Sequence, residues 1–271
     1  MSERTWFHRL RVVCLVGWIL RGGTVFAGWQ VTQTEPLAAP EGLEFVRHTV
    51  VNGSKRVELH VVRFDSKRCT LAVMDNPEGA LTLGSAALKR GALAAVNGGY
   101  FHPDGTPLGL VVWQGRELHP MERARLLSGL VVVRGGRVLL QRVAEFKPDP
   151  ATSAALQAGP FLVDAGQPVK GLEGARLAAR TVVFSDAAGE AGLVACRNAT
   201  LAETAEILSD PAVIGSVGKG TRVVRALNLD GGTSSGLWVA GKPPFYHREI
   251  KGVRNYLAVV YTPRRTSGTS R

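Results

Sequence analysis

Two loops in the sequence combine a polar side chain with a pair of glycines, and these loops are the best-placed residues for chemistry. The first follows an apolar run and reads Ala94-Ala-Val-Asn97-Gly98-Gly99; the second reads Ala226-Leu-Asn228-Leu-Asp230-Gly231-Gly232. A glycine pair lets a ligand approach the backbone closely. Asn or Asp at a strand end can also simply fix a turn. One such loop would indicate no more than a turn, whereas two at the ends of core strands favour a shared site.

The second loop carries the stronger chemical signal. Asn228 and Asp230 are two residues apart, so their side chains share one face of the predicted strand. An amide and a carboxylate would then stand side by side, ahead of the hydroxyls of Thr233-Ser-Ser235. This combination suits a site that binds and acts on a polar ligand.

Most elements that position these loops are predicted to be short strands. Residues Arg56 to Val61 alternate, with Val57, Leu59 and Val61 on one face, which predicts a half-buried strand. We expect His48 and His60 to face solvent on their strands. Asn52-Gly53 and Gly135-Gly136 indicate hairpin turns. Further strands are predicted in the ranges Leu43 to Val50, Thr70 to Met74, Ala92 to Val96, Leu130 to Val133, Val138 to Gln141, Phe161 to Asp164, Thr181 to Phe184, Leu193 to Cys196, Val223 to Leu229 and Tyr256 to Tyr261.

Only two helices are predicted. One covers Leu81 to Arg90 and ends at Gly91. The other begins at a capping box, Thr200-Leu-Ala-Glu203, and runs to about Leu208. With 32 glycines and 45% hydrophobic residues, the chain reads as one α+β domain of mostly antiparallel, curved β-sheet with a few helices. We expect that domain to cover residues 28–265, with a disordered tail at 266–271.

The N-terminal residues 1–27 predict an export signal. Basic residues precede a short apolar run from Val12 to Leu20, and Val25-Phe26-Ala27 suits a signal peptidase. The run is too short to span a bilayer. We therefore expect an exported protein, periplasmic or secreted, which would contact a membrane only through an uncleaved N-terminal segment.

The net charge and the positions of the cysteines indicate which partners and cofactors to expect. The net charge of +11 favours anionic partners, but the basic residues form no run, so we expect no nucleic-acid partner. Cys69 and Cys196 both lie in apolar strand-like runs, as two buried thiols or as a disulfide. Neither has a neighbouring His that would indicate zinc, and no oxygen-ligand cage appears, so we expect neither metal nor cofactor.

The motifs together resemble the phosphodiester glycosidase family. The resemblance runs in order from about Ala92 to Val260, through Asn-Gly-Gly-Tyr-Phe, Gln157-Ala-Gly-Pro, Arg180-Thr181 and Asn-Leu-Asp-Gly-Gly-Thr-Ser-Ser. One departure is Thr233, where the family often has Gly. Family members in bacteria are commonly exported proteins related to exopolysaccharide. The residues that carry over from the motifs are Asn97, Gly98, Gly99, Tyr100, Phe101, Gly159, Arg180, Asn228, Asp230, Gly231, Gly232 and Ser235, and Arg254 with Asn255 is similar to polar residues before the closing strand.

The resemblance implies hydrolysis of a sugar 1-phosphodiester or of a phosphorylated envelope glycan. Such a reaction needs a carboxylate near the anomeric carbon and charge stabilisation for the departing phosphate. Asp230 is the candidate carboxylate, Arg180 the candidate phosphate clamp, and Asn97 with Asn228 would orient hydroxyls or phosphate oxygens. The remaining candidate substrate-binding residues are Gly98, Gly99, Tyr100, Gly231, Gly232, Ser235 and Arg254.

Two alternatives stay open. A non-catalytic protein for binding or assembly of envelope polysaccharide would keep the cradle without turnover. Phosphodiesterase chemistry would attack phosphorus instead of carbon.

Overall fold

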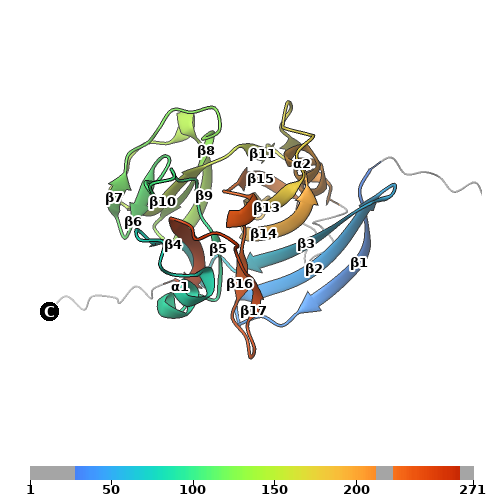
Figure 1. Cartoon of the computed structure of the whole chain (residues 1–271), viewed down its shortest axis with the longest axis horizontal. Coiled ribbons are helices and arrows are strands. Elements are labelled where there is room, and N and C mark those ends of the chain that lie inside the picture. The colour runs from blue at the N-terminus through green and yellow to red at the C-terminus, as the bar shows by residue number, and fades with distance from the viewer. Residues whose placement is uncertain (1–27, 212–221, 263–271) are drawn as a thin grey trace, which may run out of the picture.

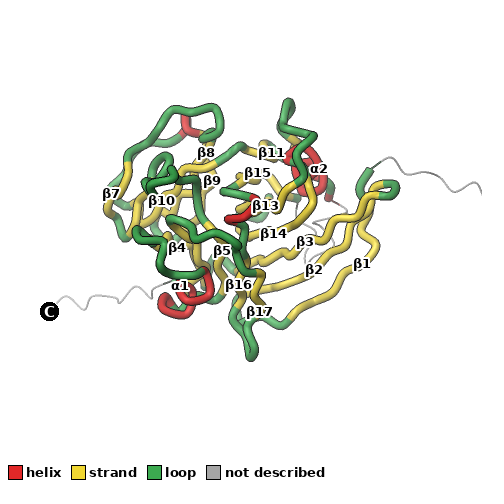
Figure 2. The backbone as a smooth tube through the Cα atoms, in the orientation of Figure 1, coloured by secondary structure: helices red, strands yellow, loops and turns green. Residues whose placement is uncertain are grey.

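In a computed structural model, residues 28–211 and 222–262 are described. The predicted signal segment and the predicted tail lie outside these residues. These residues form three antiparallel sheets and two short α-helices (Figures 1 and 2). The predicted α+β class with mostly antiparallel strands is confirmed.

The largest sheet has eight strands and supplies the second glycine loop. In spatial order it contains β1 (Gln30–Leu37), β2 (Leu43–Asn52), β3 (Lys55–Phe64), β14 (Ala191–Ala199), β13 (Ala178–Asp186), β15 (Val223–Asn228), β11 (Phe161–Asp164) and β12 (Gln167–Pro168).

Two five-stranded sheets complete the domain. One contains β7 (Arg116–His119), β6 (Val111–Trp113), β10 (Thr152–Ala158), β8 (Gly129–Arg134) and β9 (Arg137–Arg142), in that spatial order. The other contains β17 (Phe245–His247), β16 (Leu237–Val239), β5 (Ala94–Asn97), β18 (Asn255–Tyr261) and β4 (Cys69–Asp75). Strand β5, which leads into the first glycine loop, is buried between β16 and β18.

One hydrophobic core joins all three sheets. Val62 and Leu227 from the large sheet, Val96 from β5 and Val131 from β8 belong to the same buried cluster. Because the inner faces of the sheets meet there, the ends of β5 and β15 are brought together although they are far apart in the sequence. The two glycine loops extend from those ends.

The helices cover the outside of the sheets. Helix α1 (Leu83–Arg90) packs on β5 and ends at Gly91, which adopts the left-handed conformation with φ 66°. Helix α2 (Leu201–Ser209) begins with the predicted capping box, in which Thr200 Oγ1 accepts from the Glu203 amide. Both predicted helices and both predicted hairpin turns are confirmed. The described ranges also contain two short 3₁₀ helices, η1 (Val143–Glu145) and η2 (Gly232–Ser234).

The prediction that His48 and His60 face solvent was wrong, because both are buried. His60 shows the reason. Its side chain is 3% exposed, although it shares a face of β3 with Arg56 and Glu58. Strand β17 covers this part of the face, and the His60 ring lies 4.9 Å from the Phe245 ring and 4.6 Å from the His247 ring. Alternation in one strand shows which side chains share a face but not what covers that face.

Cys69 and Cys196 are both buried, and they do not form a disulfide with each other. Cys69 lies in the core between the sheets, whereas Cys196 lies in the cluster beneath α2. No described helix is both long and apolar enough to cross a membrane.

Candidate active site

The two glycine loops bond directly to each other. Asn97 Nδ2 donates to the backbone oxygen of Asp230 at 2.7 Å, and the Asp230 amide donates to the Gly98 oxygen at 3.1 Å. The loops therefore form one structural unit at the common end of β5 and β15.

Both polar atoms of the Asn97 side chain form hydrogen bonds within this unit. It is fully buried, and its Oδ1 accepts from the Thr181 hydroxyl at 2.7 Å and from the Gly236 amide at 3.1 Å. With Nδ2 also donating to Asp230, the amide is saturated by the protein. Its geometry supports a positioning role, which differs from the prediction that it orients sugar hydroxyls or phosphate oxygens.

The glycines of the first loop are required by close packing. A Cβ on Gly98 would lie 2.0 Å from Asn255 Oδ1, and one on Gly99 would lie 2.9 Å from the Gln157 oxygen. The Asn255 Oδ1 in turn accepts from the Gly99 amide at 2.9 Å. Gly98 and Gly99 therefore let the loop pack against β18 and β10, and the Gly99 amide is already used.

The second loop is more open. Asp230, Gly231 and Gly232 are partly exposed, and Gly232 has φ +63° with no atom within 4 Å of a would-be Cβ. Asp230 Oδ1 accepts from the Gly231 amide at 2.8 Å. The second loop therefore exposes a carboxylate and backbone atoms, whereas Asn97, Gly98 and Gly99 of the first loop are buried.

The environment of Asp230 disfavours its charge. Burial raises the pKa of this carboxyl, and hydrogen bonds from Ser234 and Gly231 together with the charge of Lys251 only partly oppose that effect. A carboxyl with a raised pKa is typical of functional sites, because it can exchange a proton nearer to working pH. Lys251 was not among the predicted site residues. It lies in the segment before β18, its Nζ is 5.4 Å from the centre of the Phe101 ring, and no motif marks it.

Asn228 and Tyr100 form a polar cluster beside the carboxylate. Tyr100 donates its hydroxyl to the Gly159 oxygen at 2.6 Å, and Asn228 Nδ2 lies 3.0 Å from the same hydroxyl. Burial and the nearby Asp230 charge raise the pKa of Tyr100, so its hydroxyl stays protonated. Asn228 Oδ1 is buried and finds no donor among the described residues. An unpartnered buried acceptor is costly, so this oxygen is the atom of the cluster that lacks a donor.

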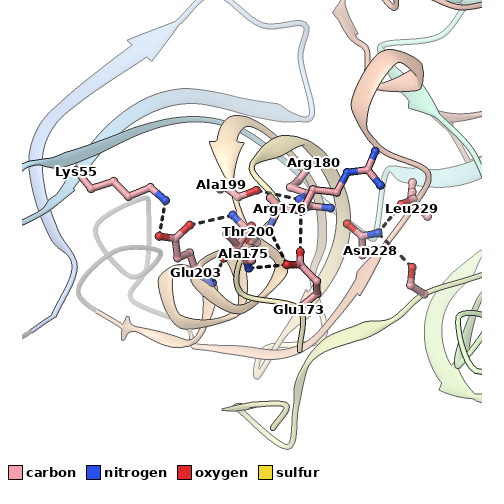
Figure 3. A network of polar contacts seen from close by, with 12 residues as sticks. Lys55, Glu173, Ala175, Arg176, Arg180, Ala199, Thr200, Glu203, Asn228 and Leu229 are labelled. Atoms are coloured by element: carbon pink, nitrogen blue, oxygen red, sulfur yellow. Dashed lines mark hydrogen bonds and ion pairs between the residues drawn. The ribbon is translucent and has the colours of Figure 1, made fainter. Parts of the chain in front are cut away.

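Arg180 is buried in β13 and is largely occupied by the protein (Figure 3). Its Nε donates to the Ala199 oxygen at 3.0 Å and its Nη2 to the Arg176 oxygen at 2.7 Å, while Glu173 lies 3.8 Å from Nη2. Burial lowers the pKa of the guanidinium. Only Nη1 has no partner within the described part of the chain. Two of the three guanidinium nitrogens of Arg180 are therefore engaged by the protein itself.

Arg254 is paired with another residue of the protein. Its guanidinium pairs with the Asp75 carboxylate, and both side chains are mostly buried. That pairing neutralises Arg254, so its geometry supports a structural ion pair instead of the predicted substrate contact. Its neighbour Asn255 instead supports the first loop.

Within residues 28–211 and 222–262, no group of three or more His, Cys, Asp or Glu side chains is arranged to hold a metal ion.

Comparisons with known proteins agree with this arrangement. The chain resembles the catalytic domain of zebrafish N-acetylglucosamine-1-phosphodiester alpha-N-acetylglucosaminidase, a structure auto-inhibited by its pro-peptide, with a TM-score of 0.61 and 17% identity over 84% of this chain and 87% of that one. A hypothetical protein from Synechocystis gives a TM-score of 0.58 and 17% identity over 85% of this chain and 64% of that one. These likenesses show the fold. No curated protein matches the sequence significantly.

The family assignment comes from the sequence model of the phosphodiester glycosidase domain, which matches residues 90–260. This range contains both glycine loops, Arg180 and the Asn228–Tyr100 cluster. The chain therefore belongs to the phosphodiester glycosidase family.

Proposed function

We propose that this protein is an exported hydrolase that cleaves the glycosidic bond of a sugar 1-phosphodiester or of a phosphorylated envelope glycan. The observation that carries the proposal is the position of Asp230. Its partly buried carboxylate stands at the junction of the two loops, with a raised pKa and with glycine backbone beside it. Family membership supports the reaction class.

Asp230 would act at the anomeric carbon. Cleavage there passes through a state with positive charge on the sugar ring, which a carboxylate stabilises as a nucleophile, a base or a fixed charge. The departing phosphate is already acidic, so it needs charge stabilisation more than a proton. Positive charge is present around the cluster, since the charge of Lys251 acts on Asp230 and that of Arg180 acts on Tyr100.

Asn228 and Tyr100 would bind the sugar. The unpartnered Asn228 Oδ1 accepts a hydroxyl, and the Gly231–Gly232 backbone can approach the ligand without side-chain obstruction. Asn97 acts indirectly, because it fixes the backbone of Asp230. Export is part of the proposal through the N-terminal sequence, which lies outside the described residues.

The first test is an assay with a methyl ester of glucose 1-phosphate. Release of glucose in water enriched in ¹⁸O should place the label on the anomeric oxygen of the sugar. Label in the phosphate would show attack at phosphorus and would overturn the glycosidase assignment. An absence of turnover on a panel of sugar 1-phosphodiesters, combined with retained glycan binding, would favour the non-catalytic envelope protein.

A further inference from the structure

A pocket of about 320 Å³ lies directly beside the second glycine loop. Ser235 and Gly236, which follow the loop, form one wall, and Ala179 forms another. The Ala179 oxygen would lie 3.0 Å from a Cβ on Gly231, so the loop and the pocket share a boundary. The volume is at the lower end of the range for small-molecule sites.

The opposite wall of the pocket is the polar face of β3 together with the end of β14. Arg56, Glu58 and His60 come from β3, and Arg197 comes from β14. On this face of β3, Arg56 and Glu58 are exposed at the open side of the pocket, whereas His60 is buried in its wall.

Two buried polar atoms in the pocket wall have no partner among the described residues, His60 Nε2 and Ser235 Oγ. His60 is 3% exposed, and its nearest acidic oxygen, Glu58 Oε1, is 3.7 Å from Nε2, beyond hydrogen-bonding distance. Burial, together with the charges of His247, Arg47 and Arg197, lowers the pKa of His60 to about 3, so the imidazole is neutral. Leaving such atoms unpaired is unfavourable, and a ligand in the pocket would remove that penalty.

The charge of the pocket is positive. Arg56 and Arg197 contribute two guanidiniums against the single carboxylate of Glu58, and both histidines have lowered pKa values. Arg197 makes no hydrogen bond or ion pair with the described part of the chain, and Arg56 makes only one long bond, to Thr49 Oγ1 at 3.4 Å. Arg180, by contrast, already donates to two backbone carbonyls. The guanidinium most available to an anion is therefore Arg197.

We propose that this pocket binds the anionic part of the substrate, a phosphate in ester linkage to a sugar, through the guanidiniums of Arg197 and Arg56. His60 Nε2 and Ser235 Oγ complete the site as hydrogen-bonding partners. The inference rests on the proposed function, since it locates the phosphate of that substrate. It assigns phosphate recognition to the end of β14, whereas Arg180 becomes a positioning residue behind the second glycine loop.

Binding and turnover can be measured separately. Isothermal titration with inorganic phosphate, glucose 1-phosphate and glucose is performed on the full chain carrying Asp230→Asn, so that no hydrolysis interferes. Glucose 1-phosphate should bind more tightly than glucose. Adding Arg197→Gln should weaken both phosphate ligands by about tenfold or more, because a charge-assisted hydrogen bond is lost. The matched control is Arg116→Gln, an exposed arginine on β7 in a different sheet, which should leave binding unchanged.

Three results would overturn the proposal: equal affinity for glucose and glucose 1-phosphate, no measurable affinity for either phosphate ligand, or phosphate binding that survives Arg197→Gln but is lost in Arg180→Lys. Circular dichroism of each variant separates lost binding from lost folding. The two proposals can fail separately. If phosphate binding depends on Arg197 but the parent protein hydrolyses no sugar phosphodiester, the phosphate-binding pocket is supported and the glycosidase function is contradicted.

Discussion

The two glycine loops have the same sequence plan and different physical situations. In the first, Asn97 is fully buried with every polar side-chain atom bonded, and neither glycine could accept a Cβ without a close contact. In the second, Asp230 is partly exposed and Gly232 has open space around it. The same motif thus forms a brace in one place and presents a carboxylate in the other. Burial and bonding, which the motif does not encode, decide between the two roles.

The largest effect should come from Asp230→Asn. We expect turnover to fall roughly a thousandfold or more, or about 4 kcal/mol of barrier, because the central carboxylate is lost. The folded pKa of Asp230 is raised, so the folded chain holds the proton more tightly, and its ionisation lowers stability as pH rises above the unfolded value. The Asn variant should accordingly melt no lower than the parent at neutral pH.

The control for that variant is Asp104→Asn. Asp104 lies just after the first loop, is exposed, and receives the Thr106 amide. Its substitution should leave turnover unchanged. Near-parental activity of Asp230→Asn would remove that carboxylate from the mechanism, and the second loop would then be a turn like any other.

The packing difference between the two glycine loops is tested by comparing the stability of Gly98→Ala with that of Gly232→Ala. A Cβ at Gly98 would lie 2.0 Å from Asn255 Oδ1 and 2.8 Å from the Asn255 backbone oxygen, so the free energy of unfolding should fall by about 3 kcal/mol or more. At Gly232 the only cost is the left-handed backbone, roughly 1–2 kcal/mol. Denaturant unfolding measures both. If the two variants lose equal stability, the packing difference between the loops has no energetic meaning.

Arg180→Lys tests what supports the second loop. An ammonium cannot reach both the Ala199 and Arg176 oxygens in the fixed geometry of a guanidinium, so we expect a loss of about 1–3 kcal/mol in stability. If Arg180 is a positioning residue, turnover on phosphodiesters and on neutral aryl glycosides should fall by similar factors. A selective loss on phosphodiesters would instead assign the phosphate to Arg180.

Local sequence patterns predicted the helices and hairpin turns, but they missed several strands and did not show which side chains other elements cover. The capping box at Thr200 and the hairpin at Asn52-Gly53 are set by contacts within a few residues, so the sequence shows them. Strand β10 was not predicted, although it is the central strand of its sheet. Five other strands were also missed: β1, β6, β7, β16 and β17. The covering of His60 by β17 depends on residues nearly two hundred positions apart.

In the candidate site, the sequence likewise identified residues that lie together but not the contacts that occupy them. The resemblance identified Asp230, Asn228 and Tyr100, which do lie together. It could not show that Asn97 and Arg254 are occupied by Asp230 and Asp75, because those bonds exist only in the folded chain. Lys251 and Arg197 had no distinguishing pattern, since single basic residues in a chain with 33 Lys and Arg carry little information.

The smallest expected effect concerns Lys251, and it tests whether the second loop is electrostatically tuned. The positive charge of Lys251 favours ionised Asp230 and opposes the larger effect of burial on that pKa. Removing the charge in Lys251→Met should therefore raise the Asp230 pKa further. If the reaction uses ionised Asp230, activity is lost as pH falls through this pKa, so the acid limb of the pH–rate profile should move to higher pH. Because Lys251 is exposed, added salt should diminish the difference between parent and variant. Lys67→Met is the control, an exposed lysine in the β3–β4 turn. A limb that moves to lower pH, or moves equally in both variants, would show that Lys251 does not act on Asp230.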